Sequence, residues 1–169
     1  SIISLGINYY SKRINVNESK YKISNYAWGE DYHTLIKKKL NSIIEFIKQY
    51  NINFKYRICV DTSPLMEKVW AQKASLGWIG KHTNLITRDY GSWIFLGEII
   101  LDCDLIYDNV FDDDLCGTCT ACIDSCPTDA IIQSYLLDSS KCISYLTIEH
   151  RADFNVDTDI NLHGWIYGC

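Results

Sequence analysis

Hydrophobic residues in the first part of the chain follow two different spacings. Apolar runs at residues 2–9 and 54–60 predict two buried strands. Between them, residues 31–50 carry apolar side chains at the 3.6-residue period of an amphipathic helix. The apolar positions of this predicted helix are Ile36, Leu40, Ile43, Ile44 and Ile47. Residues 11–29 are polar and follow neither spacing, so we predict an irregular loop there.

A second helix and a strand pair are predicted further along the chain. Ser63 and Pro64 are typical of the cap and first residue of a helix, which we expect to run to about Ser75. Segments 83–87 and 92–101 predict two strands paired with each other across a tight turn. Because strands and helices alternate, we expect an α+β fold in which helices pack on a sheet.

Composition narrows the class of protein. The 169 residues are 47% hydrophobic and 13% aromatic, which is enough for a buried core and too much for a disordered chain. The net charge of −5 argues against a strongly basic nucleic-acid-binding domain. No uncharged apolar run approaches the roughly 18–20 residues of a membrane-spanning helix, so we expect no membrane association.

The cysteine-rich part of the chain follows an acidic connector at residues 102–115. We therefore expect two domains, one with sheet and helices at residues 1–110 and a small one with most of the cysteines at residues 111–169. The chain begins inside a predicted strand and ends at Cys169, inside an apparent motif. We therefore expect an internal segment of a longer protein.

Four of the eight cysteines are packed into one short run. Its spacing, two residues twice and then three residues before a proline, matches the bacterial ferredoxin pattern for a 4Fe-4S cluster. Three thiolates at this spacing let a tight loop wrap one cuboidal cluster, and the fourth thiolate serves a second cluster. The run consists of Cys116, Cys119, Cys122 and Cys126, followed by Pro127.

Two other interpretations of the cysteine run are weaker. A disulfide framework is disfavoured because cysteines so close in sequence bridge each other poorly. A structural zinc site more often takes two cysteine pairs separated by a longer loop. Both alternatives remain open at this point.

Two further segments could carry chemistry. Asp61 follows the predicted strand 54–60 and precedes a predicted helix, and ligands collect at such strand ends in open α/β sheets. It could also do no more than cap the helix. Gly77 and Gly80 stand beside Lys81 and could let the backbone approach a large ligand, although an ordinary turn explains the same spacing.

Several motifs, taken in order, resemble the bacterial epoxyqueuosine reductases, which are cobalamin-dependent iron–sulfur enzymes of queuosine synthesis in tRNA. The ferredoxin run occurs in many families, and its combination with Val60-Asp61-Thr62 and the segment from Cys142 to Thr147 is more specific. The matching segments are Tyr26 to His33, Cys59 to Thr62, Gly77 to Lys81, Gly91 to Glu98, Cys116 to Ala130, Cys142 to Thr147 and Tyr167 to Cys169.

The resemblance implies a cobalamin-binding α/β layer followed by a bacterial-ferredoxin-like module with two 4Fe-4S clusters. The first cluster would be bound by Cys116, Cys119 and Cys122. The second would be bound by Cys126, Cys142 and Cys169. Each cluster would take its remaining ligand from beyond residue 169, so we expect this segment alone to be inactive.

The resemblance also implies roles outside the clusters. Asp61 aligns with the proposed proton donor, and Leu85, Leu96 and Ser144 match stretches that line the corrinoid. Arg151 and Asp153 lie where the family meets tRNA.

The implied reaction is the last step of queuosine synthesis, the reduction of epoxyqueuosine to queuosine at the tRNA wobble position. The partners would be that tRNA and an external electron donor, and we expect a cytoplasmic monomer. Three alternatives remain: another cobalamin and iron–sulfur reductase such as a reductive dehalogenase, a plain ferredoxin-type electron-transfer domain, and a structural cysteine-rich domain.

Overall fold

The computed structural model describes residues 1–12, 21–50, 53–151 and 161–169, and it mixes helices and strands. The chain divides into two compact units. Unit 1 comprises Ser1–Tyr10, Gly29–Ile79 and Asn84–Leu115. Unit 2 comprises Ser11–Trp28, Gly80–Thr83 and Cys116–Cys169. Each unit thus combines segments that are distant in sequence.

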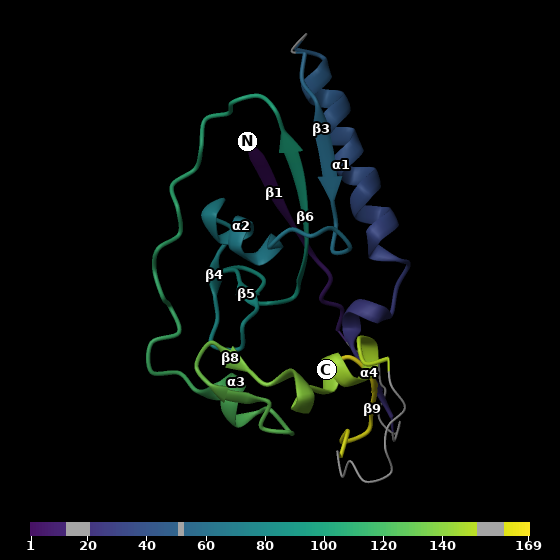
Figure 1. Cartoon of the computed structure of the whole chain (residues 1–169), viewed down its shortest axis with the longest axis vertical. Coiled ribbons are helices and arrows are strands. Elements are labelled where there is room, and N and C mark those ends of the chain that lie inside the picture. Colours follow the sequence, from purple (N-terminus) through teal and green to yellow (C-terminus); the bar gives the residue numbers. More distant parts are fainter. Residues whose placement is uncertain (13–20, 51–52, 152–160) are drawn as a thin grey trace. The chain divides into compact units, whose positions relative to one another are not determined.

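A three-stranded antiparallel sheet forms the centre of unit 1 (Figure 1). Its strands are β1 (Ile2–Asn8), β6 (Ile94–Leu101) and β3 (Tyr56–Cys59), in the order β1-β6-β3. In one row across the sheet, Glu98 lies between Ser4 of β1 and Cys59 of β3. Since paired residues point to the same face, these three side chains share one side of the sheet.

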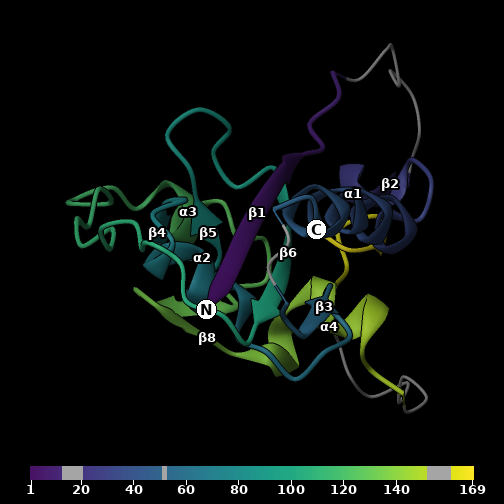
Figure 2. The ribbon, with the colours of Figure 1, turned by 90° about the horizontal axis from the view of Figure 1, so that it is seen from above.

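The two helices of unit 1 cover opposite faces of this sheet (Figure 2). Helix α1 (Tyr32–Lys48) buries Ile36, Leu40 and Ile44 in a core that includes Val60, Ile99 and Leu101. A Cβ on Gly97 would lie 2.6 Å from a methyl of Ile36, so a glycine is needed where α1 meets β6. Helix α2 (Glu67–Lys73) packs on the alternate face, where Glu98 points.

The predicted helix at residues 31–50 and the predicted strand at 2–9 are confirmed, with small differences at their ends. The Asp31 side chain caps α1 by accepting a hydrogen bond from the His33 backbone amide at 2.9 Å.

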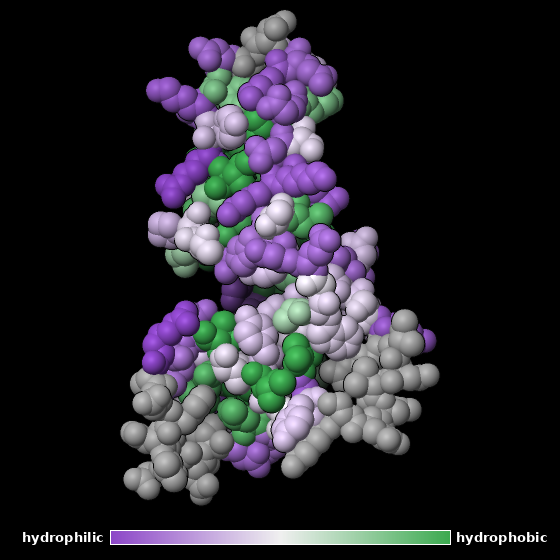
Figure 3. Space-filling view, turned by 90° about the vertical axis from the view of Figure 1, so that its right-hand side faces the viewer, coloured by the Kyte–Doolittle hydropathy of each residue, from purple (hydrophilic) through white to green (hydrophobic). Residues whose placement is uncertain are grey.

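The outer side of α1 is polar. Seen from that side, the surface residues of the helix are largely hydrophilic (Figure 3).

The predicted start of the second helix is wrong. Helix α2 begins at Glu67, after Met66, and not at Pro64 with a Ser63 cap. The backbone amide of Leu65 donates to the Ser63 carbonyl and that of Glu67 donates to the Leu65 carbonyl. These tight turns replace the bonds of a first helical turn, and the chain becomes helical only after them.

The predicted pairing of segments 83–87 and 92–101 is also wrong. Strand β5 (Leu85–Ile86) pairs with β4 (Trp78–Ile79), because both edges of β6 are occupied by β1 and β3. Only a single bridge between Thr87 and Gly91 closes the predicted turn. A Cβ on Gly77 would lie 1.9 Å from the Ile86 carbonyl oxygen, so this glycine serves the approach of β4 to β5.

Unit 2 is built from short elements. Strand β2 (Lys22–Ile23) pairs in parallel with β9 (Trp165–Tyr167), so part of the predicted 11–29 loop is regular. Residues 13–20 of that loop lie outside the described residues. The remaining elements are α3 (Ala121–Asp124), β7 (Ile131–Gln133), β8 (Leu136–Leu137), α4 (Ile143–Ile148), and the 3-10 turns η1 (Asn25–Ala27) and η2 (Ser139–Lys141).

The acidic connector at residues 102–115 contains no helix or strand, as predicted. Across the ranges of the chain that the structure describes, none of the helices combines the length and the apolar character that crossing a bilayer would require.

Candidate functional site

Asp61 lies just after β3, at a turn with unusual backbone geometry. Its φ is +53°, in the left-handed region that aspartate tolerates better than most residues. Its backbone amide donates to Glu67 Oε1 at 2.5 Å, which fixes the turn against the start of α2. The Asp61 side chain is 60% exposed, so its carboxylate is accessible to a ligand.

His33, in the first turn of α1, connects Asp61 to Asp31. Asp61 Oδ2 lies 3.3 Å from His33 Nε2, and His33 Nδ1 lies 2.7 Å from Asp31 Oδ1. The bond from the His33 ring lowers the pKa of Asp31, so Asp31 is ionised and accepts the proton on Nδ1. His33 Nε2, on the other side of the ring, faces Asp61 Oδ2, so the imidazole bridges the two carboxyl groups.

An aromatic cluster extends from His33 along β6 and β1. Tyr32 stacks on Phe95 with ring centroids 4.1 Å apart, and Phe95 contacts Tyr9 at 4.5 Å. Trp93 contacts both Tyr9 and Tyr10, and the residues Trp93 and Tyr10 remain 43% and 54% exposed. Flat apolar groups pack well on such rings, so this surface fits a macrocycle or a base.

The three residues matched to corrinoid-lining stretches occupy different elements. Leu85 is buried in β5, and Leu96 is half-buried in β6 on the same face as Glu98. Ser144 is half-buried in α4 and belongs to unit 2, whereas the two leucines belong to unit 1. The aromatic cluster reaches Asp61 only through His33, which stacks on Tyr32, and its exposed members Trp93 and Tyr10 lie at its other end.

The first two cysteines of the run lie in a loop that Lys81 holds from inside unit 2. Cys116 and Cys119 are joined by a turn in which the Cys119 amide donates to the Cys116 carbonyl at 2.9 Å. Cys122 follows in α3. Lys81 is only 9% exposed, and its Nζ donates to the Gly117 carbonyl at 2.6 Å and the Cys119 carbonyl at 2.8 Å. This lysine therefore fixes the backbone between two predicted cluster ligands.

The three cysteines assigned to the second cluster lie near one another. Burial raises the pKa of the Cys169 thiol, and the neighbouring Cys126 and Cys142 thiolates raise it further, while Lys22 lowers it. Cys126, Cys142 and Cys169 all belong to unit 2, and Cys169 lies within electrostatic range of the other two.

The Cys126 sulfur accepts hydrogen bonds from the backbone. Burial by itself raises the pKa of Cys126, but the amides of Ile131, Thr128 and Ala130 and the Thr128 hydroxyl outweigh it, so the pKa is lowered. The Ala130 amide lies 3.2 Å from the sulfur. Amide bonds to sulfur stabilise the thiolate form that ligates iron, and they help to set the potential of a cluster.

Gly168 positions Cys169. Its φ is +65°, and a Cβ there would lie 2.5 Å from both the Ser24 and the Tyr26 hydroxyl oxygens. Its amide donates to the Thr147 hydroxyl at 2.9 Å, which ties the end of β9 to α4. Only glycine fits this position without strain.

The cysteine thiols of this chain are of the type that ligates an iron–sulfur cluster. All eight cysteines are free thiols. In the described ranges, no three His, Cys, Asp or Glu side chains are grouped as a site for one metal ion. A cuboidal cluster bonds each thiolate to a different iron, so its ligands need not converge on one point. The thiol set and the amide bonds to Cys126 fit iron–sulfur binding.

The sequence analysis did not foresee the roles of His33 and Glu67, or the contact that Lys81 makes. His33 and Glu67 contact Asp61 from α1 and α2, and Lys81 contacts the cysteine loop. For Lys81 the local pattern shows a cation after two glycines and no sign of its partner, because the contact joins distant segments. Of the two residues assigned to tRNA, Arg151 is exposed and Asp153 lies outside the described residues.

Comparison with protein families gives two matches that divide the chain. Residues 1–62 match a family described as "Epoxyqueuosine reductase QueG, DUF1730". Residues 115–169 match a "4Fe-4S double cluster binding domain". The second match supports iron–sulfur clusters as the cofactors of the cysteine-rich part.

Curated relatives match over the whole chain. The chain is 48% identical to an epoxyqueuosine reductase of Cyclobacterium marinum, covering 100% of this chain and 55% of the relative. It is 47% identical to one of a Synechocystis species, covering 100% of this chain and 59% of the relative. The chain therefore spans a little over half the length of these relatives.

Solved structures show the same fold. An epoxyqueuosine reductase with an epoxyqueuosine-modified tRNA-Tyr stem loop has a TM-score of 0.90 at 28% identity, over 99% of this chain and 45% of that one. A second solved structure is that of the Bacillus subtilis enzyme, described with an aspartate-bearing catalytic loop swung out of the active site. It has a TM-score of 0.85 at 27% identity, and the match covers 99% of this chain and 45% of that one. The likeness to epoxyqueuosine reductases covers the whole of this chain in sequence and nearly all of it in fold.

Proposed function

We propose that this chain forms the catalytic and cluster-binding part of an enzyme that reduces epoxyqueuosine to queuosine in tRNA. The observation that carries the proposal is the 48% identity, over all of this chain, to a named epoxyqueuosine reductase. The solved relative bound to a modified tRNA stem loop supports a tRNA substrate. The protein would work in the cytoplasm as a monomer and take electrons from an external donor.

The two predicted domains would divide the work. Residues 1–110 would bind cobalamin and carry Asp61, with Leu85 and Leu96 against the corrinoid, and Ser144 would contribute from residues 111–169. Bound cobalamin would supply the two-electron chemistry at carbon that no side chain provides. The clusters would deliver single electrons, one held by Cys116, Cys119 and Cys122 and the other by Cys126, Cys142 and Cys169.

Asp61 would act as a general acid. The reaction opens the epoxide, releases its oxygen as water and leaves a carbon–carbon double bond, which consumes two electrons and two protons. The exposed Asp61 carboxyl group would donate a proton to the opening oxygen. His33, held by Asp31, would orient Asp61 and return a proton to it between turnovers. The turn at Asp61 would correspond to the aspartate loop that swings out in the Bacillus subtilis relative.

An Asp61→Asn substitution in the complete, anaerobically reconstituted protein tests this role. Because asparagine keeps the size but cannot donate an acidic proton, we expect kcat for epoxyqueuosine in a tRNA stem loop to fall about 10²- to 10⁴-fold. Asp108→Asn, at an exposed position of the acidic connector, is the matched control and should keep the normal rate. Normal turnover by Asp61→Asn would refute the general-acid role.

Two further assays separate the alternatives. A reductive dehalogenase would reduce a halogenated aromatic compound and leave the tRNA stem loop unchanged. A plain ferredoxin domain would show cluster absorbance but no corrinoid spectrum after incubation with cobalamin.

A further inference from the structure

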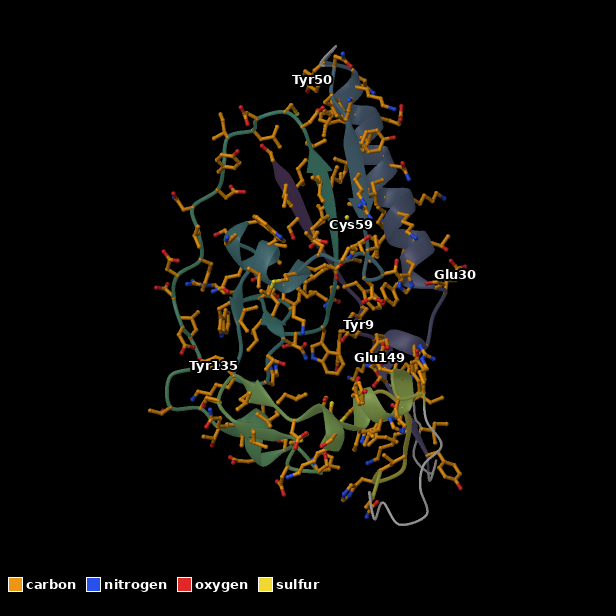
Figure 4. The ribbon with its side chains drawn as sticks, in the orientation of Figure 1. Tyr9, Glu30, Tyr50, Cys59, Tyr135 and Glu149 are labelled. Carbon is orange, nitrogen blue, oxygen red and sulfur yellow. The ribbon has the colours of Figure 1, made fainter. Side chains whose placement is uncertain are left out.

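Glu98 is an acidic side chain in the middle of the sheet of unit 1. It lies on β6 with 0% of its surface exposed, between Ser4 of β1 and Cys59 of β3, which is labelled in Figure 4. Ser4 Oγ donates to Glu98 Oε1 at 3.2 Å. Glu98 Oε2 has no hydrogen-bonding partner among the described residues. An ionised carboxylate in this position is costly, so the site favours the neutral acid.

Glu67 lies against Glu98 from the α2 side of the sheet. Burial raises the pKa of Glu98 to about 8, and the nearby Glu67 charge adds to the rise. Burial also raises the pKa of Glu67, although the hydrogen bond from the Asp61 amide lowers it. The two carboxyl groups therefore share an environment that tolerates one negative charge and opposes two.

The negative charge on Glu67 strengthens a hydrogen bond that holds the turn at Asp61. As a carboxylate, Glu67 accepts the Asp61 backbone amide at 2.5 Å, and this bond joins α2 to the left-handed turn that presents the Asp61 side chain. A charged acceptor makes this hydrogen bond stronger than a neutral one would be.

We propose that Glu67 and Glu98 form a proton-dependent latch that positions Asp61: a neutral Glu98 lets Glu67 stay charged and hold the Asp61 amide, and loss of the Glu98 proton repels Glu67 and releases the turn. The catalytic use of the latch rests on the proposed role of Asp61, but its opening does not. Both glutamates are positioning residues, because they act on Asp61 through its backbone.

Other titratable groups around the latch are few. Asp61 and His33 face Glu67 from the turn and from α1, and Cys59 flanks Glu98 in the sheet. Lys68 follows Glu67 on α2, but its Nζ donates to Asn84 at 2.9 Å. Burial raises the pKa of Glu98 to about 8, so we expect the release of the turn to follow the titration of this carboxyl group.

Hydrogen exchange of the amides at residues 61–66 tests the proposal in the complete reconstituted protein. After correction for the intrinsic pH dependence of exchange, we expect these amides to exchange about tenfold faster at pH 9 than at pH 6.5, which is the ratio for losing one hydrogen bond to a charged group. Glu98→Gln, which stays neutral, should abolish the pH response. Glu67→Gln should exchange faster at both pH values.

Controls make each outcome decisive. Glu45→Gln, on the exposed side of α1, should behave as the wild type. A wild-type protein without a transition near pH 8, or a Glu98→Gln protein that keeps it, would overturn the latch. Should Glu98→Gln fail to fold, the wild-type titration alone still decides. If the latch responds as expected while Asp61→Asn retains full turnover, the latch stands and the general-acid role fails.

The stability of the protein gives a second readout. The folded pKa of Glu98 lies above its ordinary value near 4.5, so the folded state keeps a proton that the unfolded chain has lost. This contribution is complete below about pH 4.5 and is lost as pH rises through about 8. The fall in Tm between pH 6 and 9 should therefore be smaller in Glu98→Gln than in Glu45→Gln, and equal falls would contradict the proposal.

Discussion

Unit 1 buries a continuous apolar cluster between α1 and its sheet, whereas the buried side chains that the structure describes in unit 2 are few and include a lysine and a serine. The core of unit 1 contains Ile36, Leu40, Ile44, Val60, Ile99 and Leu101. Among the described residues of unit 2, the buried hydrophobic ones are Ala130, Ile143 and Leu146. In place of a comparable core, unit 2 has loops that present thiols.

This contrast indicates two sources of stability. A region with so small an apolar core needs a disulfide, a metal or a partner to stay folded, and unit 2 has free thiols in a 4Fe-4S pattern. Unit 1 holds its reactive groups on elements that its own core fixes. The clusters should therefore be structural as well as redox components of unit 2, while unit 1 should fold without them.

The largest expected effect is that of removing iron. With iron and sulfide left out of the reconstitution, amides of α4 and of the loop at residues 116–126 should lose protection against hydrogen exchange by about 100-fold or more, because cluster binding and folding are coupled there. Amides of β1 and β6 should keep their protection. Equal loss in both units, or no loss in unit 2, would contradict the comparison.

A cavity in the core of unit 1 should have the next largest effect. Leu40 is 0% exposed, so Leu40→Ala should lower the free energy of unfolding by about 2–5 kcal/mol in a urea titration. Leu35→Ala, on the exposed side of the same helix, should change it by no more than about 0.5 kcal/mol. The iron content should be the same in both variants, and a lower value in Leu40→Ala would show that the units do not fold independently.

The smallest expected effect is that of removing the buried charge of unit 2. Lys81→Met leaves the Gly117 and Cys119 carbonyls without their donor, at a cost of about 1–3 kcal/mol. We expect iron to pass to a chelator about tenfold faster than in the wild type, which is the rate ratio for a loss near 1.4 kcal/mol. Lys39→Met, at an exposed position of α1, should release iron at the wild-type rate. Equal release by Lys81→Met would show that the lysine does not hold the cluster loop.

The spacing of apolar residues predicted those helices and strands whose formation depends on neighbouring residues in the sequence. The spacing of Ile36, Leu40 and Ile44 predicted α1, because a helix places these positions on one face. The apolar run at residues 92–101 predicted a strand, which is confirmed, but its predicted partner was wrong. Pairing joins segments that are far apart in sequence, and a run of apolar residues does not specify which edge it will meet.

Local sequence patterns also predicted some features of the candidate sites. The spacing of the cysteines from Cys116 to Cys126 predicted their chemistry, because a loop that wraps a cluster needs ligands at fixed short intervals. The position of Asp61 at a strand end predicted a place for a ligand. The assigned ligand roles of the cysteines stay predictions, and the role of Asp61 is the one that Asp61→Asn tests.

The sequence by itself determined the apolar face of α1, the strand runs and the set of thiols, since each follows from a period or a spacing within a few residues. The tertiary structure alone decided which groups meet across the fold. His33 contacts the Asp61 side chain, Glu67 accepts from the Asp61 backbone amide and lies near Glu98, and Lys81 contacts the cysteine loop. Charges and hydrogen bonds depend on distance in space, and the distance between residues far apart in sequence is set only when the core has packed.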